Sequence, residues 1–448
     1  MGPLRPLVAA LVLGCGAGTN TVTCRDLDTG YAASYRGPAA LAECLADPRM
    51  QSEGHRREAV ASPGRYDFGG AGRFELTGGM ALRGAGSDRT TLYASRPTRS
   101  VFGDDIRSAL WVRGAGVELG GFTFDGSCRD GPSPGPECAR DDDQTLLAIV
   151  VACGYGFERG PDCDVDGLRI DDVRVLNVKT PFVATGSDPN PAAGQKALFA
   201  NFRDFHWTIR RFSVSGRDDP FRYARIFELG NASTADISQG PGAGVAEPRH
   251  YVVDIEDTSI DTHVGKAGGQ LAGVLTMAVN APVSLAVNLR RSSLRGTERV
   301  VGIATHALEG PGRDAGSALF RCEDSELVAD QRDWAGKLKE DPKGSICPPF
   351  DAAVYVGEFS LPGGSHRSRA ELVRCNVSVE GWLALCPAPA SIDTGGERLA
   401  AHASVCLRES RVEPAVRGPI EACQSGAGGG DAGAADAGAS PRRAQVSK

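Results

Sequence analysis

A six-residue pattern recurs eight times in this 448-residue chain, between residues 119 and 412. It consists of an apolar residue, two polar or small residues, a small or apolar residue, any residue and a second apolar residue. Its copies begin at Leu119, Ile170, Ile209, Ile255, Leu289, Cys322, Leu372 and Leu407. Further apolar runs precede most copies, at residues 146–152, 224–229, 274–279, 300–304 and 352–356. Two short strands per repeat, joined by connections of variable length, predict the stacked coils of a β-solenoid.

The second and third positions of the pattern carry charges whose sign alternates from copy to copy. Asp171–Asp172 is followed by Arg210–Arg211, Glu256–Asp257, Arg290–Arg291 and Glu323–Asp324. If successive copies stack about 4.8 Å apart, each acidic pair lies between two basic pairs. Opposite charges on neighbouring strands are stabilising, so we interpret the doublets as a stacking order. The alternative is an anion-binding stripe of Arg210, Arg211, Arg290 and Arg291, which we disfavour because each step supplies the partner acids.

Length and composition agree with an elongated body. A chain of this length exceeds the size of an ordinary single core, whereas a solenoid escapes that limit because each coil packs only on its neighbours. The net charge of -7 and pI near 5.6 argue against a general nucleic-acid binder, so we expect no nucleic-acid partner. We expect a signal peptide over 1–14, a linker over 15–38, the β-helix over 39–423 and a disordered Gly/Ala/Asp tail over 424–448.

The first residues resemble an export signal. The apolar run Leu7–Leu13 is too short to cross a bilayer as a helix but suits a secretory signal peptide. The tetrapeptide ending at Cys15, Val-Leu-Gly-Cys, resembles a bacterial lipobox, which implies a lipidated cysteine as the mature N-terminus. The alternative is an ordinary signal peptide cleaved nearby. We expect a bacterial envelope location, at the outer membrane or outside the cell, with the lipid as the sole membrane contact.

The chain contains 13 cysteines, and assigning Cys15 to the lipid leaves twelve for six disulfides. Local spacing suggests the pairs Cys24/Cys44, Cys128/Cys138, Cys153/Cys163, Cys322/Cys347, Cys375/Cys386 and Cys406/Cys423. The sequence alone does not fix this connectivity. Neither a C-x-x-C motif nor a Cys/His cluster at zinc spacing competes with disulfides, so the cysteines indicate an oxidising compartment.

The segment before the first copy resembles the entry of the pectin-lyase-like superfamily. Residues 39–45 read as a short helix, followed by the V-x-x-P-G-x-Y run of residues 60–66. Leu82-Arg-Gly-Ala-Gly86 and Thr90-Thr-Leu92 then match an L-x-G-x-G-x-x-x-T-x-L segment. By pattern the resemblance extends over residues 39–415, and it implies an all-β, right-handed parallel β-helix with a short N-terminal capping helix. That superfamily contains lyases, hydrolases, esterases, epimerases, tailspikes and adhesins, so the fold does not choose a function.

No complete catalytic pattern of that superfamily is present, and the catalytic residues therefore stay unknown. The hydrolases of the family use a paired Asp-Asp, for which Asp218–Asp219 is the nearest match, but the family's Gly-His-Gly and Arg-Ile-Lys motifs do not follow. The lyases hold calcium with carboxylates. Asp164 and Asp166 lie on one side of an extended chain and are candidate ligands for a structural calcium ion; the alternative is a solvated acidic run. We expect no other cofactor.

Three segments on successive repeats combine aromatic and charged residues, as sugar-binding grooves do. We take nine of their residues as a candidate ligand groove: Arg203, His206, Trp207, Asp218, Asp219, Arg222, Arg225, His263 and Lys266. The alternative is that Trp207 is buried and the charges solvate loops. We therefore expect an envelope lipoprotein whose β-helix is a binding or structural module, with polysaccharide as its partner. The alternatives are a carbohydrate-active enzyme, a lyase ahead of a hydrolase, and a protein-binding scaffold.

Overall fold

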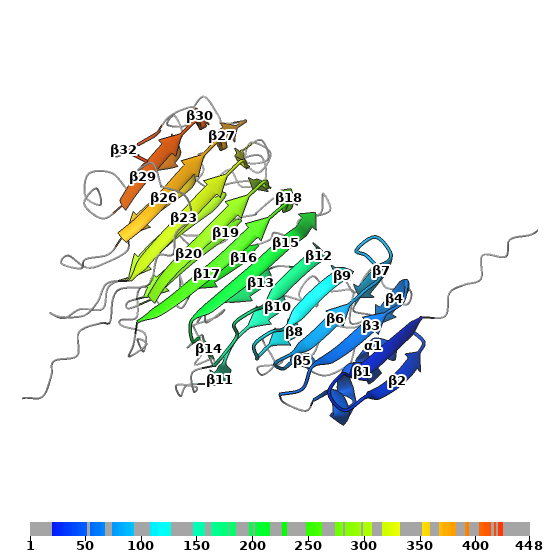
Figure 1. The fold of residues 1–448 in the computed structure, drawn as a ribbon. Helices are drawn as coiled ribbons and strands as arrows, with labels where there is room; N and C mark the ends of the chain where they lie inside the picture. The colour runs from blue at the N-terminus through cyan, green and yellow to red at the C-terminus, as the bar shows by residue number, and fades with distance from the viewer. Residues whose placement is uncertain are drawn as a thin grey trace, which may run out of the picture.

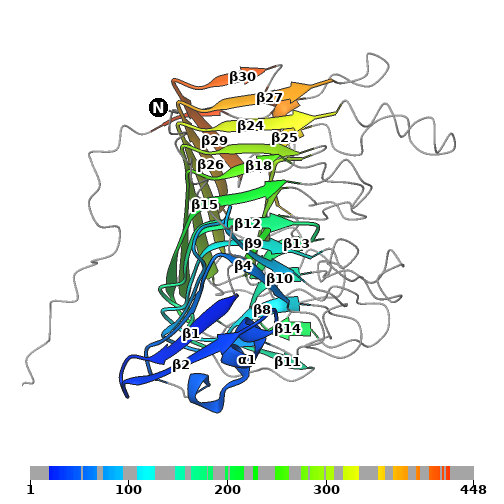
Figure 2. The same ribbon diagram turned by 90° about the vertical axis from the view of Figure 1, so that its right-hand side faces the viewer.

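The computed structural model describes residues 20–51, 54–67, 74–93, 108–126, 147–156, 163–178, 180–184, 197–199, 202–215, 226–230, 248–261, 274–280, 283–296, 299–306, 316–331, 352–358, 367–381, 390–393, 403–413, 416–417 and 420–423. Successive coils lie side by side along one axis, from the N-terminal cap to the last strands (Figure 1). The same stack is seen from its side in Figure 2.

Most strands belong to one large sheet of twenty strands. Its members are β1 (Thr21–Asp26), β2 (Tyr31–Arg36), β3 (Arg57–Ala61), β4 (Gly64–Asp67), β6 (Met80–Arg83), β7 (Thr90–Tyr93), β9 (Glu118–Asp125), β12 (Arg169–Leu176), β15 (Phe205–Ser215), β17 (Arg249–Glu256), β18 (Ser259–Asp261), β20 (Val283–Arg290), β21 (Ser293–Gly296), β23 (Ser317–Glu323), β24 (Glu326–Asp330), β26 (Arg367–Val373), β27 (Asn376–Glu380), β29 (Ala403–Arg408), β30 (Arg411–Glu413) and β32 (Ile420–Ala422).

A smaller sheet of ten parallel strands contributes one strand per coil. It contains β5 (Phe74–Leu76), β8 (Ser108–Val112), β10 (Leu147–Val151), β13 (Thr180–Ala184), β16 (Phe227–Gly230), β19 (Leu275–Asn280), β22 (Val301–His306), β25 (Ala352–Glu358), β28 (Ala390–Asp393) and β31 (Val416–Arg417). An antiparallel pair, β11 (Gly154–Gly156) and β14 (Ala197–Phe199), lies outside both sheets. The chain passes from the small sheet to the large sheet and back once per coil, which makes it a parallel β-helix as predicted.

The register agrees with the sequence pattern in all eight copies. Leu119 pairs with Ile170, Ile170 with Ile209, and Ile209 with Ile255. The later copies continue the row as Ile255–Leu289, Leu289–Cys322, Cys322–Leu372 and Leu372–Leu407. Because a shift of one residue would turn every inward side chain outward, the apolar first position fixes this register.

The N-terminal end is closed by a small cap. Residues 21–36, which the sequence pattern assigned to a linker, form an antiparallel hairpin of β1 and β2, and β1 also pairs with β3. The linker prediction was wrong because every second side chain of β1 is buried. Val22 and Cys24 are 0% exposed and pack against the predicted helix, α1 (Ala40–Ala46). A 3-10 turn, η1 (Pro48–Met50), follows α1.

Asp47 ties the cap together. Its Oδ2 accepts hydrogen bonds from the hydroxyls of Tyr31 and Tyr35, both at 2.7 Å, and its Oδ1 accepts one from the backbone N–H of Arg49 at 2.9 Å. The Arg49 side chain pairs with the same carboxylate and lowers its pKa. The hairpin is thereby fixed to the turn that follows the helix.

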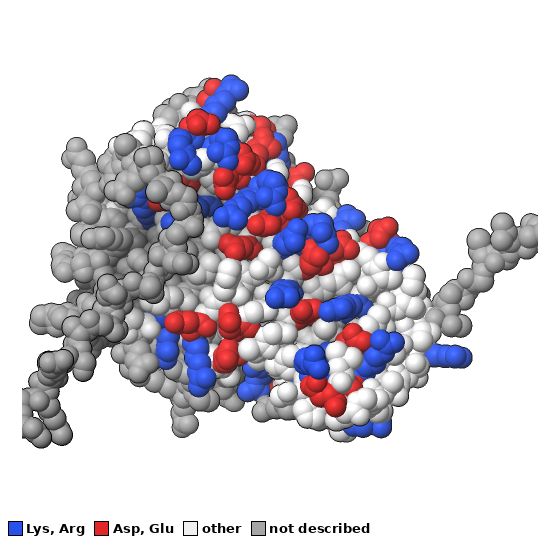
Figure 3. Space-filling view, in the orientation of Figure 1, with Lys and Arg blue, Asp and Glu red and all other residues white. Residues whose placement is uncertain are grey.

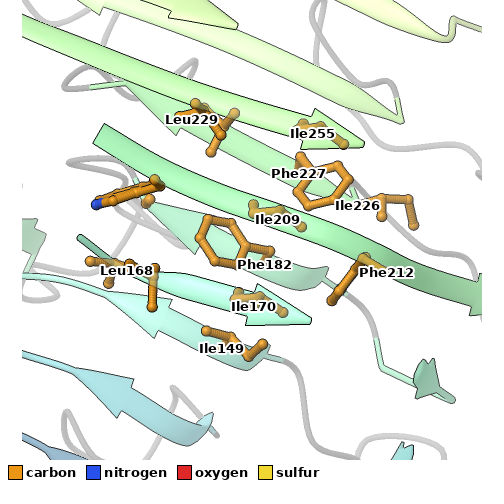
Figure 4. Packing of buried hydrophobic residues seen from close by; sticks show 14 of the residues in the cluster. Ile149, Leu168, Ile170, Phe182, Ile209, Phe212, Ile226, Phe227, Leu229 and Ile255 are labelled. Atoms are coloured by element: carbon orange, nitrogen blue, oxygen red, sulfur yellow. The ribbon is translucent and has the colours of Figure 1, made fainter. Parts of the chain in front are cut away.

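The core lies between the two sheets. Phe182 of β13 and Phe227 of β16 face the inward residues of β15, with ring centroids 6.1 Å from Phe182 to Trp207 and 5.2 Å from Phe227 to Phe212 (Figure 4). These four side chains are 0% exposed. Aromatic residues are concentrated in the middle coils, while the later coils are filled mainly by Val, Leu, Ile and Ala together with Phe320.

The third position of the pattern adopts a left-handed backbone conformation. Its φ lies between 47° and 57° in seven copies: Asp172, Arg211, Asp257, Arg291, Asp324, Arg374 and Glu409. In the first copy Gly121 has φ 70°. The bend breaks the alternation of the strand, so positions two and three both face outward and positions one and four both face inward. The sequence showed the doublet but not the conformation that causes it.

Small hydroxyl residues at the fourth position satisfy the backbone at the bend. Ser292 Oγ accepts a hydrogen bond from the N–H of Thr258 at 3.1 Å and donates to the carbonyl of Arg290 at 2.7 Å. Ser325 Oγ repeats the arrangement one coil later, accepting from the N–H of Ser292 at 3.0 Å. The hydroxyls form a buried ladder that links neighbouring coils.

Four disulfides are present among the described residues. Cys24–Cys44, Cys153–Cys163 and Cys406–Cys423 are as predicted. The predicted pairs Cys322/Cys347 and Cys375/Cys386 are wrong, because Cys322 is bonded to Cys375. Position one of one copy and position four of the next both face inward, which brings their Cα atoms to 6.3 Å. Cys128, Cys138, Cys347 and Cys386 lie outside the described residues.

Ser292→Ala should lower the free energy of unfolding by about 1–3 kcal/mol, because it leaves the Thr258 N–H buried without a partner and removes one of the two hydrogen bonds that the Arg290 carbonyl accepts. Ser293→Ala changes the adjacent, outward-facing serine and should cost less than about 0.5 kcal/mol. Urea denaturation of the two variants measures the difference. Equal losses would contradict the role assigned to the hydroxyl ladder.

Candidate functional site

The outward residues at the bend form one continuous surface, which we call the charged corner: positions two and three of the eight copies. Asp171 pairs with Arg210 in the strand register, Arg210 with Glu256, Glu256 with Arg290, and Arg290 with Glu323. The predicted alternation of charge along the stack is therefore confirmed. Acidic and basic groups are interleaved along this side of the molecule (Figure 3).

The arginines at position three make the shortest contacts of the charged corner. Arg291 Nε lies 2.8 Å from Asp257 Oδ1, and its Nη2 lies 3.2 Å from Glu256 Oε2. Arg374 repeats this geometry with Asp324 and Glu323, at 2.6 Å to each. Hydrogen bonds from the arginines lower the pKa of Asp257 and of Asp324. The four arginines of the disfavoured anion-binding stripe are likewise paired with acids of neighbouring coils: Arg210 and Arg290 with Glu256, Arg211 with Asp171, and Arg291 with Asp257.

A second row of polar residues precedes the pattern by one position and lies outside the six residues that define it. It contains Glu118, Arg169, Thr208, Asp254, Asn288, Arg321 and Glu371. Arg321 Nε lies 3.0 Å from Glu371 Oε2, and Asn288 Nδ2 donates to Asp254 Oδ1 at 2.7 Å. Extending the aligned pattern by one residue upstream would have shown its opposite charges.

The charged corner contains an open groove of about 640 Å³ over its later coils, which we call the first groove. Four coils line it, through residues 257–259, 291–293 and 324–326 and through Arg374 and Asn376. Each of the four coils contributes a charged residue at position three of the pattern. Each also contributes a hydroxyl, amide or carboxylate side chain at position five. The same kind of hydrogen-bonding group therefore recurs with the coil spacing.

A second groove of about 510 Å³ lies over the early coils of the same corner. Residues 83–86 and 118–121, with Arg169, Asp171, Asp172 and Arg211, line it. Gly120 and Gly121 stand where later copies carry charged doublets. The turn before β7 folds toward this gap, and Ser87 Oγ donates to Asp172 Oδ1 at 2.7 Å.

Of the nine residues of the predicted ligand groove, the structure describes three, which are Arg203, His206 and Trp207. Trp207 is 0% exposed, stacks on Phe205 with centroids 3.8 Å apart and donates from Nε1 to the Val165 carbonyl at 2.7 Å. It is a core residue, and its assignment to a ligand groove is corrected. Arg203 and His206 are exposed, and His206 Nε2 lies 2.6 Å from Asp254 Oδ2. Asp218, Asp219, Arg222, Arg225, His263 and Lys266 lie outside the described residues.

Asp164 and Asp166 precede β12 and are both exposed. Asp164 Oδ1 accepts from the N–H of Asp166 at 3.1 Å, and Asp166 Oδ1 accepts from the N–H of His206 at 2.7 Å. Within the described ranges, no group of three or more His, Cys, Asp or Glu side chains is placed to hold a metal ion. These two carboxylates act as turn and inter-coil acceptors, and a calcium ion bound to them stays a prediction.

Two carboxylates and an arginine meet where β24 and β27 end. Arg295 Nη1 lies 3.1 Å from Asp330 Oδ2 and 2.9 Å from Glu380 Oε2. Because both oxygens bond to one nitrogen, they lie within about 6 Å of each other. Asp330 and Glu380 are register partners on adjacent strands. The six-residue pattern did not predict this cluster, because all three residues follow its last position.

Exposed apolar side chains and apolar helices also bear on function. Among the described residues, the exposed large apolar side chains are Leu27 in the cap and Ile420 in the last coil. The described part of the chain also contains no helix of the length and apolarity needed to span a membrane.

Comparison with known proteins gives a structural likeness and no match in sequence. No protein-family model matches the chain, and no curated protein matches it. The structure is similar to the A-module of the mannuronan C-5 epimerase AlgE4 of Azotobacter vinelandii, with 12% identity over 86% of this chain and 96% of that one and a TM-score of 0.34. The parallel β-helix itself is established by the strand pairing described above.

Arg291→Glu should lower the urea midpoint more than Arg291→Gln. The new glutamate would lie between Glu256–Asp257 on one coil and Glu323–Asp324 on the next, so that five acidic residues gather on three coils. The left-handed backbone does not prevent the substitution, because Glu409 already adopts this conformation. The difference between the two variants should shrink in high salt, since exposed charges are screened. The stabilisation by Asp257 should be present above the ordinary pKa of a carboxyl and be lost as the pH falls through its lowered pKa in the folded state.

Arg36→Glu, on the exposed face of β2 in the cap, is the matched control and should behave like the parent protein. Equal midpoints for Arg291→Gln and Arg291→Glu at low salt would show that the alternation does not stabilise the stack.

Proposed function

We propose that this chain is an exported, lipid-anchored protein of the bacterial envelope whose β-helix binds polysaccharide along the charged corner. The observation that carries the proposal is the first groove, which presents a polar group on each of four successive coils. Stacked strands repeat about every 4.8 Å, which is close to the length of one sugar residue in an extended chain. A repeating polymer can therefore meet the same kind of group at each step.

The chemistry of the first groove favours a hydroxyl-rich polymer. Ser259 and Asn376 face outward at position five and offer donors and acceptors to hydroxyl groups, and Ser293 Oγ, which donates to Glu326, offers an acceptor. The arginines and acids around them are paired with one another, so the groove has little unbalanced charge to attract a polyanion. An open groove also accepts a chain along its length, whereas pockets for small molecules enclose most of the ligand.

Export is supported by the disulfides. Four pairs are at bonding distance, and structural disulfides persist in oxidising compartments outside the cytosol. Lipidation at Cys15 would hold the β-helix at a membrane surface with its corner free to meet envelope or extracellular glycans. Cys15 lies outside the described residues, and its lipidation rests on the lipobox-like sequence.

The second candidate function is a carbohydrate-active enzyme, and the cluster of Arg295, Asp330 and Glu380 favours it. Retaining glycosidases use two carboxyl groups about 5–5.5 Å apart, and an arginine beside two carboxylates also suits lyase chemistry on an acidic sugar. This alternative requires new reducing ends or unsaturated products when the protein is incubated with polysaccharide. It also requires that Glu380→Gln abolish them.

The binding proposal predicts retardation of the protein in gels that contain a soluble polysaccharide, tested with dextran, yeast mannan, laminarin and xylan. The double variant Ser293→Ala/Asn376→Ala should lose about tenfold or more in affinity, since two hydrogen bonds contribute roughly 1–3 kcal/mol. Ser34→Ala and Ser404→Ala, on the cap and on β29, should bind as the parent does. Failure of all four polymers to retard the protein, or unchanged binding by the double variant, would overturn the proposal.

Lipidation of Cys15 makes a separate prediction about membrane association. Cys15→Ala should move the protein from the membrane fraction to the soluble fraction of a bacterial host, because a lipid chain supplies most of the membrane affinity. Formation of Cys322–Cys375 in both proteins is the control for export. Membrane association that persists in Cys15→Ala with this disulfide formed would contradict lipidation.

A further inference from the structure

The first groove carries one charge that the fold does not balance. Three acids and two arginines line it, namely Asp257, Asp324, Glu326, Arg291 and Arg374. Arg291 pairs with Asp257 at 2.8 Å, and Arg374 pairs with Asp324 at 2.6 Å. Glu326 is exposed, and no lysine or arginine among the described residues forms an ion pair with it. The lining of the groove therefore has an excess of one negative charge, located at Glu326.

Glu326 lies between two neutral hydrogen-bonding side chains on adjacent strands. In the strand register it pairs with Ser293 of β21 on one side and with Asn376 of β27 on the other, and all three residues line the first groove. Ser293 Oγ donates to Glu326 Oε2 at 3.3 Å, so the other carboxylate oxygen stays open to a ligand. The Ser293 hydroxyl and the Asn376 amide oxygen can also accept hydrogen bonds. Because adjacent strands are about 4.8 Å apart, the three acceptors form one short row.

A row of acceptors with a negative charge at its centre matches an ammonium group that has hydroxyl groups beside it. An ammonium group carries three N–H donors and one positive charge. A metal ion fits less well, because within the described ranges no three His, Cys, Asp or Glu side chains are grouped to hold one. In an amino sugar the ammonium group and its neighbouring hydroxyls are attached to one ring. A single sugar residue can therefore bind to the carboxylate and to the polar side chains on either side of it.

We infer that the first groove selects polymers of amino sugars with free amino groups, with Glu326 binding the ammonium group and Ser293 and Asn376 binding the hydroxyls beside it. This inference rests on the proposed polysaccharide-binding function and names the class of polymer that the same groove prefers. Neutral polymers bind through the hydroxyl contacts alone. An amino sugar adds a charge-assisted hydrogen bond, which is about twice as strong as a neutral one. N-acetylation removes the charge and two of the three N–H donors, so it should remove this gain.

The test compares glycol chitosan with the same polymer after N-acetylation, because both are soluble and they differ at the amino group. In mildly acidic buffer at low salt the amino groups are protonated, while ordinary carboxyl groups are ionised. The full-length protein should bind glycol chitosan about fivefold or more tightly than the acetylated polymer, measured by retardation in gels that contain each polymer.

Glu326→Gln should abolish this preference, because the amide keeps the shape of the side chain and loses its charge. The net charge of -7 attracts any polycation, so the matched control is Glu43→Gln, which removes an exposed carboxylate from α1 in the cap. The control should keep the preference of the parent protein.

Three results would overturn the amino-sugar inference and leave polysaccharide binding standing. They are equal binding of the two polymers by the parent protein, a preference that survives Glu326→Gln, and a preference that Glu43→Gln abolishes to the same extent. Failure of the parent protein to bind any of dextran, mannan, laminarin and xylan would overturn the binding proposal and this inference with it.

Discussion

The left-handed backbone at the third position of each copy is the constraint on which the rest of the structure depends. For residues other than glycine this conformation costs roughly 1–2 kcal/mol, so a stack of such bends needs compensation at every coil. Buried hydroxyls satisfy the backbone on the inner side, as Ser292 and Ser325 do. On the outer side, ion pairs such as Arg291 with Asp257 connect neighbouring coils. Position three therefore suits a residue that both tolerates the bend and reaches a neighbouring coil.

The bend also explains why the chemistry gathers at one corner. Elsewhere the large sheet shows alternate residues outward, but at the bend two consecutive side chains face solvent on each coil. Each coil therefore places twice as many outward side chains at the bend as along the rest of the strand. Because the sign of their charge alternates between coils, neighbouring charges attract and do not repel each other. Gly120–Gly121 interrupts the row where the turn before β7 approaches, and Ser87 contacts Asp172 across the gap. The hollow of the second groove follows from the packing of these backbones.

Much of this arrangement could be predicted from the sequence, because apolar periodicity and charge alternation both report on stacking. The strands, their register and three of the disulfides followed from local spacing. Cys322–Cys375 did not, since its geometry depends on which positions of adjacent copies face inward across the bend. The hairpin of β1 and β2 was missed because its alternation falls outside the repeat. Trp207 illustrates the remaining ambiguity: an aromatic residue next to charges reads equally as a platform or as core, and only its 0% exposure decides.

The site was harder to predict than the fold for a physical reason. A single coil contributes between one and four residues to each groove, so the groups that meet across coils are 30 or more residues apart in the sequence. Pattern matching detects what the copies share, whereas selectivity arises where a copy departs from the rest. Glu326, a carboxylate between neutral side chains of the first groove, is such a departure, and so is the ending of β24 and β27 in Asp330 and Glu380. In a solenoid the regular positions set the spacing that a repeating polymer can follow, and the irregular positions decide which polymer is held.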